Sequence, residues 1–90
     1  LDAYLPPRNE SPTVAAVNGA IYLLGGSEIG RSLSGVQRFI PAEQRWEYAA
    51  TLPVPRRGGK AAVVGDDIYL LGGENIGFNT LGRVDVLSSR

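Results

Sequence analysis

Ile21-Tyr22-Leu23-Leu24-Gly25-Gly26 returns almost unchanged as Ile68-Tyr69-Leu70-Leu71-Gly72-Gly73, 47 residues further along the chain. Flanking residues keep this spacing, since Ala15 matches Ala62, Val17 matches Val64 and Leu5-Pro6 matches Leu52-Pro53. A repeat of this length indicates two similar units that pack side by side.

Each unit contains short apolar runs separated by turn residues. Asn18-Gly19 is the strongest hairpin signal, because both of its positions favour positive φ. No stretch keeps helical periodicity over ten residues. The chain is therefore predicted to be all-β, without a helix longer than one turn. Strands are expected at 14–17, 20–24, 35–40, 45–49, 60–64, 68–71 and 84–87, with an eighth, an edge strand, at 1–5 before Pro6-Pro7.

Four short antiparallel strands per repeat are typical of a β-propeller blade. The alanines of the first strand suit the narrow centre of a propeller, and Gly25-Gly26 suits a sharp bend beside a neighbouring blade. Trp46 is expected to be largely buried between blades. The predicted organisation is an outer strand of a preceding blade at 1–5, a first blade at 6–53, and three strands of a second blade at 54–90.

The composition excludes several classes of site. The 90 residues include nine basic and nine acidic side chains, which argues against a nucleic-acid or anionic-membrane partner. There is no cysteine and no histidine, so no disulfide, no zinc site of the usual ligands and no Ser-His-Asp or Cys-His constellation is expected. No catalytic residue, metal or cofactor is predicted. No targeting signal is visible, and a cytoplasmic location is only the default expectation.

The chain resembles the kelch repeat. The resemblance rests on the apolar quartets before the two Gly-Gly pairs, on Val36-Gln37-Arg38-Phe39 with Pro41, on Trp46, and on Leu52-Pro53 followed by Arg56. It departs from the kelch pattern where Phe39 and Leu87 stand in place of a tyrosine. The resemblance implies a propeller made of such blades.

Glu28 and Glu74 lie in equivalent loops of the two units. A facing pair of carboxylates is the arrangement of glycosidases. The alternative, which we favour, is two solvated loop acids.

Kelch binders resemble one another in using two sets of loops on one rim, one after Gly-Gly and one around Pro-Arg. The predicted binding residues on these loops are Ser27, Glu28, Arg31, Arg56, Arg57, Glu74 and Asn75, with Arg8 and Asn79 beside them. Arginine suits bidentate capture of carboxylates or phosphates. Arg56 or Arg57 is expected to matter to binding more than any acidic residue. The alternative for Arg56 is that it braces a neighbouring blade.

Three functions are open at this point. The favoured one is a non-catalytic binding scaffold that presents polar rim loops to a protein or peptide. The second is a carbohydrate-binding or sugar-isomerising protein that resembles bacterial sialic-acid mutarotases, for which Phe78 would be the aromatic platform. The third is a structural part of a larger propeller with its ligand site elsewhere.

Two blades leave apolar faces and edges bare, so a further blade is expected. One possibility is a homo-oligomer of three chains that form a six-bladed ring, with strand 1–5 of one copy pairing with strand 84–87 of the next. The other is that the chain is an excerpt of a longer propeller.

Overall fold

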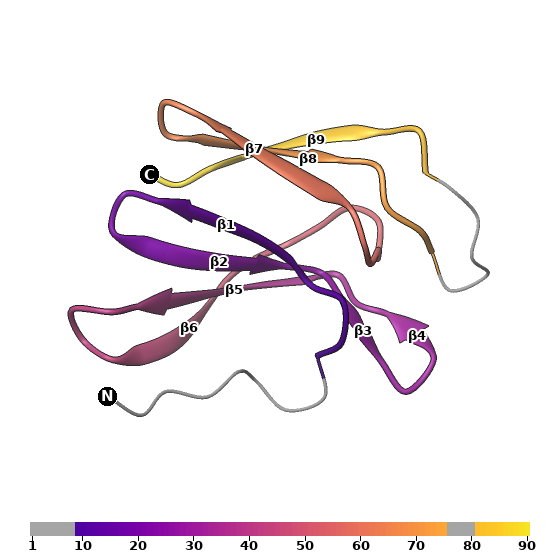
Figure 1. Ribbon diagram of the computed structural model, residues 1–90, viewed down its shortest axis with the longest axis horizontal. Coiled ribbons are helices and arrows are strands. Elements are labelled where there is room, and N and C mark those ends of the chain that lie inside the picture. Colours follow the sequence, from indigo (N-terminus) through magenta and orange to yellow (C-terminus); the bar gives the residue numbers. More distant parts are fainter. Residues whose placement is uncertain (1–8, 76–80) are drawn as a thin grey trace.

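The computed structural model of the protein describes residues 9–75 and 81–90. Its strands are β1 (Thr13–Val17), β2 (Ala20–Leu24), β3 (Ser27–Glu28), β4 (Arg31–Ser32), β5 (Gly35–Ile40), β6 (Arg45–Thr51), β7 (Lys60–Val64), β8 (Asp67–Leu71) and β9 (Val84–Ser88) (Figure 1). The described part of the chain has no helix that could cross a membrane.

Seven of these strands form two antiparallel sheets. The first blade is a four-stranded sheet in the order β1-β2-β5-β6, and the second blade is a three-stranded sheet in the order β7-β8-β9. The all-β prediction is confirmed, and the predicted strands in the described residues are present with ends shifted by at most two residues. The predicted strand at 1–5, together with Arg8, Phe78 and Asn79, lies outside the described residues.

The turns explain why the strands end where they do. Asn18 and Gly19 have φ values of 49° and 74°, which confirms the predicted Asn-Gly hairpin turn. The loop after Gly25-Gly26 contains a feature that the sequence did not predict, because β3 and β4 form a small second hairpin there. Two-residue strands are too short to show a periodic pattern, so the same residues looked like an irregular loop.

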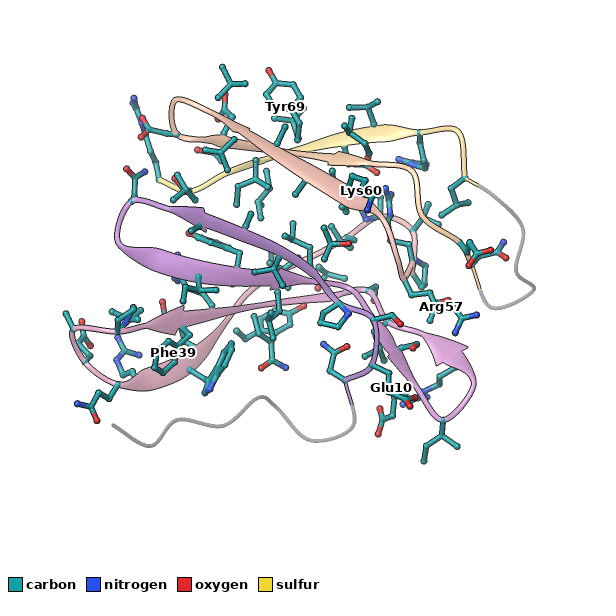
Figure 2. The ribbon with its side chains drawn as sticks, viewed as in Figure 1. Glu10, Phe39, Arg57, Lys60 and Tyr69 are labelled. Carbon is teal, nitrogen blue, oxygen red and sulfur yellow. The ribbon has the colours of Figure 1, made fainter. Side chains whose placement is uncertain are left out.

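The two blades stack face to face. Strands β1 and β7, the first strand of each blade, lie side by side. Tyr69 and Phe39 point away from each other on the two outer sides of this stack (Figure 2). Because side chains alternate along a strand, each blade has one face in the stack and one outer face.

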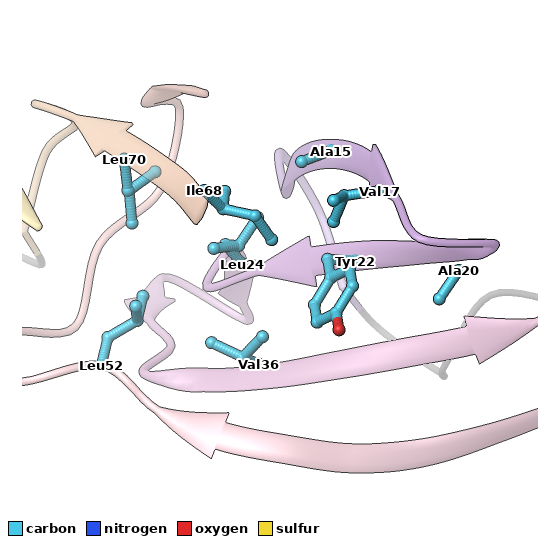
Figure 3. Close-up of a cluster of buried hydrophobic side chains, with 9 residues drawn as sticks. All are labelled: Ala15, Val17, Ala20, Tyr22, Leu24, Val36, Leu52, Ile68 and Leu70. Carbon is cyan, nitrogen blue, oxygen red and sulfur yellow. The ribbon is translucent and has the colours of Figure 1, made fainter. Parts of the chain in front are cut away.

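The core lies between the blades. The first blade contributes buried side chains from β1, β2 and β5, and the second contributes Ile68 and Leu70 from β8 (Figure 3). Leu52, which follows β6, closes the cluster. One continuous core across two sheets means that neither blade buries this apolar face by itself.

Trp46 does not lie between the two blades of this chain, so its predicted burial between blades is not seen there. It pairs with Phe39 across β5 and β6, with the ring centroids 5.1 Å apart, and it is only half-buried. The pairing puts Trp46 on the outer face of the first blade, since Val36 and Leu24 occupy the other face. The sequence identified the strand, but the face depends on the strand register.

At each Gly-Gly pair the backbone bends and passes close to the segment that joins the two blades. Gly25 has a φ of 66° and Gly73 a φ of 99°, a region that favours glycine. A Cβ at Gly25 would collide with the carbonyl oxygen of Arg56, and one at Gly73 would lie 2.9 Å from that of Arg57. The expected need for a sharp bend without a Cβ is confirmed.

Candidate functional site

The loops after the two Gly-Gly pairs gather at one end of the molecule with the segment that joins the blades (Figure 1). Isolated backbone bridges hold them, one between Glu10 and Ser27 and one between Arg57 and Glu74. The two bridges are 47 residues apart, which shows that the repeat extends into the loops. We call this end the rim; it comprises residues 27–34, 53–58 and 74–75.

The β3–β4 hairpin carries Arg31 into solvent. Ile29 and Gly30 form its turn with positive φ, and Glu28 pairs with Arg31 in the backbone register. The Arg31 side chain is 66% exposed, and its Nη2 lies 3.4 Å from Oε2 of Glu28. Ser27 is buried, and its hydroxyl donates to the carbonyl oxygen of Glu10 at 3.0 Å. Ser27 therefore anchors the hairpin, whereas Arg31 is its accessible cation.

Arg56 is fully buried between the blades. Its guanidinium forms an ion pair with Asp85 of β9 and donates to the carbonyl oxygens of Gly72 at 3.3 Å and Val54 at 3.4 Å. Its backbone binds the first blade, because its N–H donates to the carbonyl of Leu33 at 3.0 Å. This geometry is that of a brace between blades, the alternative considered for this arginine.

Asp85 is the common partner of two arginines. Arg83 donates to it through Nε at 3.0 Å and Nη2 at 2.9 Å, and Arg56 contacts it from the interior. Hydrogen bonds from Arg83 and then from Arg56 lower the pKa of Asp85 below its ordinary value of 3.8, against an opposing effect of burial. The carboxylate is therefore charged at neutral pH and compensates the buried guanidinium.

Arg57 and Glu74 join the rim loops of the two units. Each donates its backbone N–H to the other's carbonyl oxygen, at 3.0 and 2.9 Å, and the Nε of Arg57 is 4.0 Å from Oε1 of Glu74. The hydroxyl of Ser32 donates to the carbonyl oxygen of Glu74 at 3.4 Å. Through these contacts, the β3–β4 hairpin of the first blade touches the loop of the second.

A surface hollow of about 370 Å³ lies where these loops meet. The described residues that line it are Arg31, Ser32, Val54, Pro55 and Asn75. Val54 and Pro55 form an apolar wall, Arg31 supplies a cation, and Ser32 and Asn75 supply polar groups. Such a combination suits a short peptide that carries a carboxylate beside an apolar side chain.

The predicted site residues thus separate into groups. Arg31 and Asn75 line the hollow, while Glu28, Arg57 and Glu74 lie in the loops around it. Ser27 and Arg56 are buried supports. The apolar wall was not predicted, although Val54 and Pro55 directly follow the Leu52-Pro53 motif and are apolar residues in a loop, a signal that could have identified them.

Glu28 and Glu74 each have an arginine beside them. Glu28 contacts Arg31, and Glu74 contacts Arg57. No described cluster of acidic side chains has a metal-binding arrangement.

The sequence comparison agrees with this architecture. The kelch motif matches residues 10–53, which include all of β1 to β6 and so the complete first blade. No curated protein matches the chain. A kelch motif supports the general assignment of a protein-binding scaffold. The matched motif and the blade that contains it confirm the resemblance of this chain to the kelch repeat.

Proposed function

We propose that this protein is a non-catalytic scaffold that binds an acidic peptide segment of a partner protein in the rim hollow. The observation that supports the proposal most directly is the meeting of Arg31 from the first blade and Asn75 from the second beside the Val54-Pro55 wall. A site built from two blades requires both to be in place. A ligand there would hold the rim loops together.

The chemistry of the lining favours a peptide. A carboxylate of the ligand can replace Glu28 as the partner of Arg31, because that ion pair is long and solvent-exposed. The apolar wall offers contact to one side chain next to the acid. No aromatic ring lines the hollow among the described residues, and a stacking platform is what a sugar site would add.

Peptides selected from a phage-displayed library on the 90-residue protein test this proposal. We expect the selected sequences to share an Asp or Glu next to an apolar residue. A synthetic peptide with the selected sequence is then titrated by fluorescence anisotropy. Arg31→Glu is expected to weaken its binding about tenfold or more, because a charge-assisted hydrogen bond is replaced by repulsion.

Arg45→Glu is the matched control. Arg45 is half-exposed, pairs with Glu43 and Glu47, and is the first residue of β6, next to the β5–β6 turn at the end of the molecule opposite the rim (Figure 1). Its reversal should change the peptide affinity by less than about twofold. Selected peptides without acidic residues, or equal affinities for the Arg31→Glu and Arg45→Glu variants, would show that the hollow is not the site. Competition by a free sugar acid such as sialic acid would favour the carbohydrate alternative.

A further inference from the structure

The outer face of the second blade is apolar and exposed. On β7, β8 and β9 it presents Val64, Leu71, Val84 and Val86, each more than two-fifths exposed, around the half-buried ring of Tyr69. Figure 2 shows Tyr69 at the outer side of the sheet. A contiguous apolar face of this kind marks an interaction surface.

The repeat identifies what this face is equivalent to. Leu71 corresponds to Leu24 and Val84 to Val36, which are both completely buried under the second blade. Leu71 is 41% exposed and Val84 is 59% exposed. The equivalent surface is thus buried in the first blade, where the second blade packs on it, and exposed to solvent in the second blade.

The repeat also identifies the surface of a blade that would pack on this exposed face. In the second blade, Ile68 of β8 and Ala61 of β7 pack into the stack. Their equivalents in the first blade are Ile21 and Val14, on its outer face, where Val14 is exposed and Ile21 is half-buried, while Leu23 and Phe39 of the same face are already buried in the single chain. The molecule therefore carries the two complementary surfaces of a blade-to-blade contact on its opposite sides (Figure 2).

A contact between the second blade of one copy and the first blade of the next would also include a pair of opposite charges. Within the chain, the hydroxyl of Thr13 on β1 donates to the carbonyl oxygen of Gly59, two residues after Arg57. Lys60 is equivalent to Thr13, and Glu10 is equivalent to Arg57. The residue equivalent to Gly59 is Pro12, two residues after Glu10. A repeated contact of this kind would place Lys60 beside Pro12 of the next copy and bring its ammonium toward the carboxylate of Glu10; both charged residues are exposed.

One polar contact between the two blades of the chain would have no equivalent in the contact between copies. Asn18 in the β1–β2 turn donates to Oδ1 of Asp66 at 2.8 Å and to the hydroxyl of Ser89 at 2.6 Å. The residue equivalent to Asn18 is Gly65, which has no side chain to donate. The repeated contact is therefore expected to be weaker than the one inside the chain and to depend on protein concentration.

We infer that the outer face of the second blade binds the outer face of the first blade of a second copy of this chain, head to tail, with Lys60 facing Glu10. This inference concerns a surface distinct from the rim and does not depend on the proposed peptide site. The contact is heterologous, so successive copies extend the stack, into a ring where the rotation between copies closes and into a filament where it does not.

The test is the mass of the 90-residue chain in solution, measured by multi-angle light scattering from micromolar to millimolar concentration. We expect the mass to rise with concentration from 9.6 kDa to more than two chains, because a head-to-tail contact leaves a free face at each end of a dimer. Val86→Glu should raise the dissociation constant roughly 10- to 100-fold, since it places an unpaired carboxylate in the contact. Val86 is exposed in the single chain, so its replacement should leave the fold intact.

Ile29→Glu is the control for that change, because Ile29 is exposed at the β3–β4 turn, away from both faces, and its replacement should leave assembly unchanged. Lys60→Glu should weaken assembly roughly two- to tenfold, and Lys60→Glu combined with Glu10→Lys should restore it. A monomer at all concentrations would overturn the inference. So would an assembly that stops at two chains and is insensitive to Lys60→Glu, because such a dimer would be isologous.

Discussion

Asp85→Ala is expected to lower the free energy of unfolding by about 3 kcal/mol, because it leaves the guanidinium of Arg56 buried without its carboxylate. Arg56 is fully enclosed, and its remaining acceptors are the carbonyl oxygens of Gly72 and Val54. Neither carries a full negative charge. Urea denaturation followed by Trp46 fluorescence measures the loss.

Two further variants show whether burial is the cause. Glu43→Ala removes an exposed partner of Arg45 and should change the stability by less than about 1 kcal/mol. The double variant Arg56→Met with Asp85→Leu removes both buried charges and should recover most of the stability lost in Asp85→Ala. Equal stability of Asp85→Ala and Glu43→Ala would contradict the role of Arg56 as a brace.

The same ion pair predicts a dependence on pH. The pKa of Asp85 is lower in the folded protein than in the unfolded chain, mainly through hydrogen bonds from Arg83 and Arg56. Its contribution to stability is therefore fully present above the unfolded pKa of about 3.9 and is lost as the pH falls through the lower folded pKa. The stability difference between the natural protein and Asp85→Ala should narrow on acidification below about pH 4.

Glu47 and Asp66 also have lowered pKa values, through Arg38 and Arg45 for Glu47 and through Asn18 and Arg90 for Asp66. The natural protein and the Asp85→Ala variant both keep Glu47 and Asp66, so the contribution of these two groups cancels in the stability difference between the two proteins. Urea denaturation midpoints of both proteins at several pH values measure this stability difference. A difference that stays constant down to the acid limit would mean that Asp85 contributes by packing and not by its charge.

Leu24→Ala and Leu71→Ala are expected to differ strongly, although the two leucines occupy the same position of the repeat. Leu24 is buried under the second blade, and its truncation leaves a cavity that costs about 3 kcal/mol. Leu71 lies on the uncovered face, and its truncation should cost less than about 1 kcal/mol in the single chain.

The comparison is made by urea denaturation at low protein concentration, where copies do not associate. Each leucine then serves as the control for the other, because the side chain removed and its strand propensity are identical. Equal losses would mean that the outer face of the second blade is already covered in the single chain. A larger loss for Leu71→Ala at high protein concentration would agree with the inferred contact between copies.

The sequence alone determined the units of this protein. The repeated Ile-Tyr-Leu-Leu-Gly-Gly stretch, the Asn18-Gly19 turn and the alternation of apolar residues depend on local backbone preferences, so they predicted the seven strands of the two described sheets and the bends correctly, although they missed the two-residue strands β3 and β4. The two rim loops could also be located in this way, because they come directly after the Gly-Gly and Pro-Arg motifs. Strands, turns and loop positions are set by neighbouring residues, and a local stretch of sequence is therefore enough to predict them.

Only the tertiary structure decided how these units use their side chains. Trp46 was expected to be largely buried but is half-buried on the outer face of the first blade, since the face depends on the pairing of β5 with β6 and not on the residue itself. Arg56 and Arg57 are neighbours in the sequence with the same charge, yet one is enclosed with Asp85 while the other lies in the rim. Leu24 and Leu71 are equivalent in the repeat, but one is buried and one is exposed. Whether a side chain is buried depends on the segment that packs against it, and that segment can be far away in the sequence.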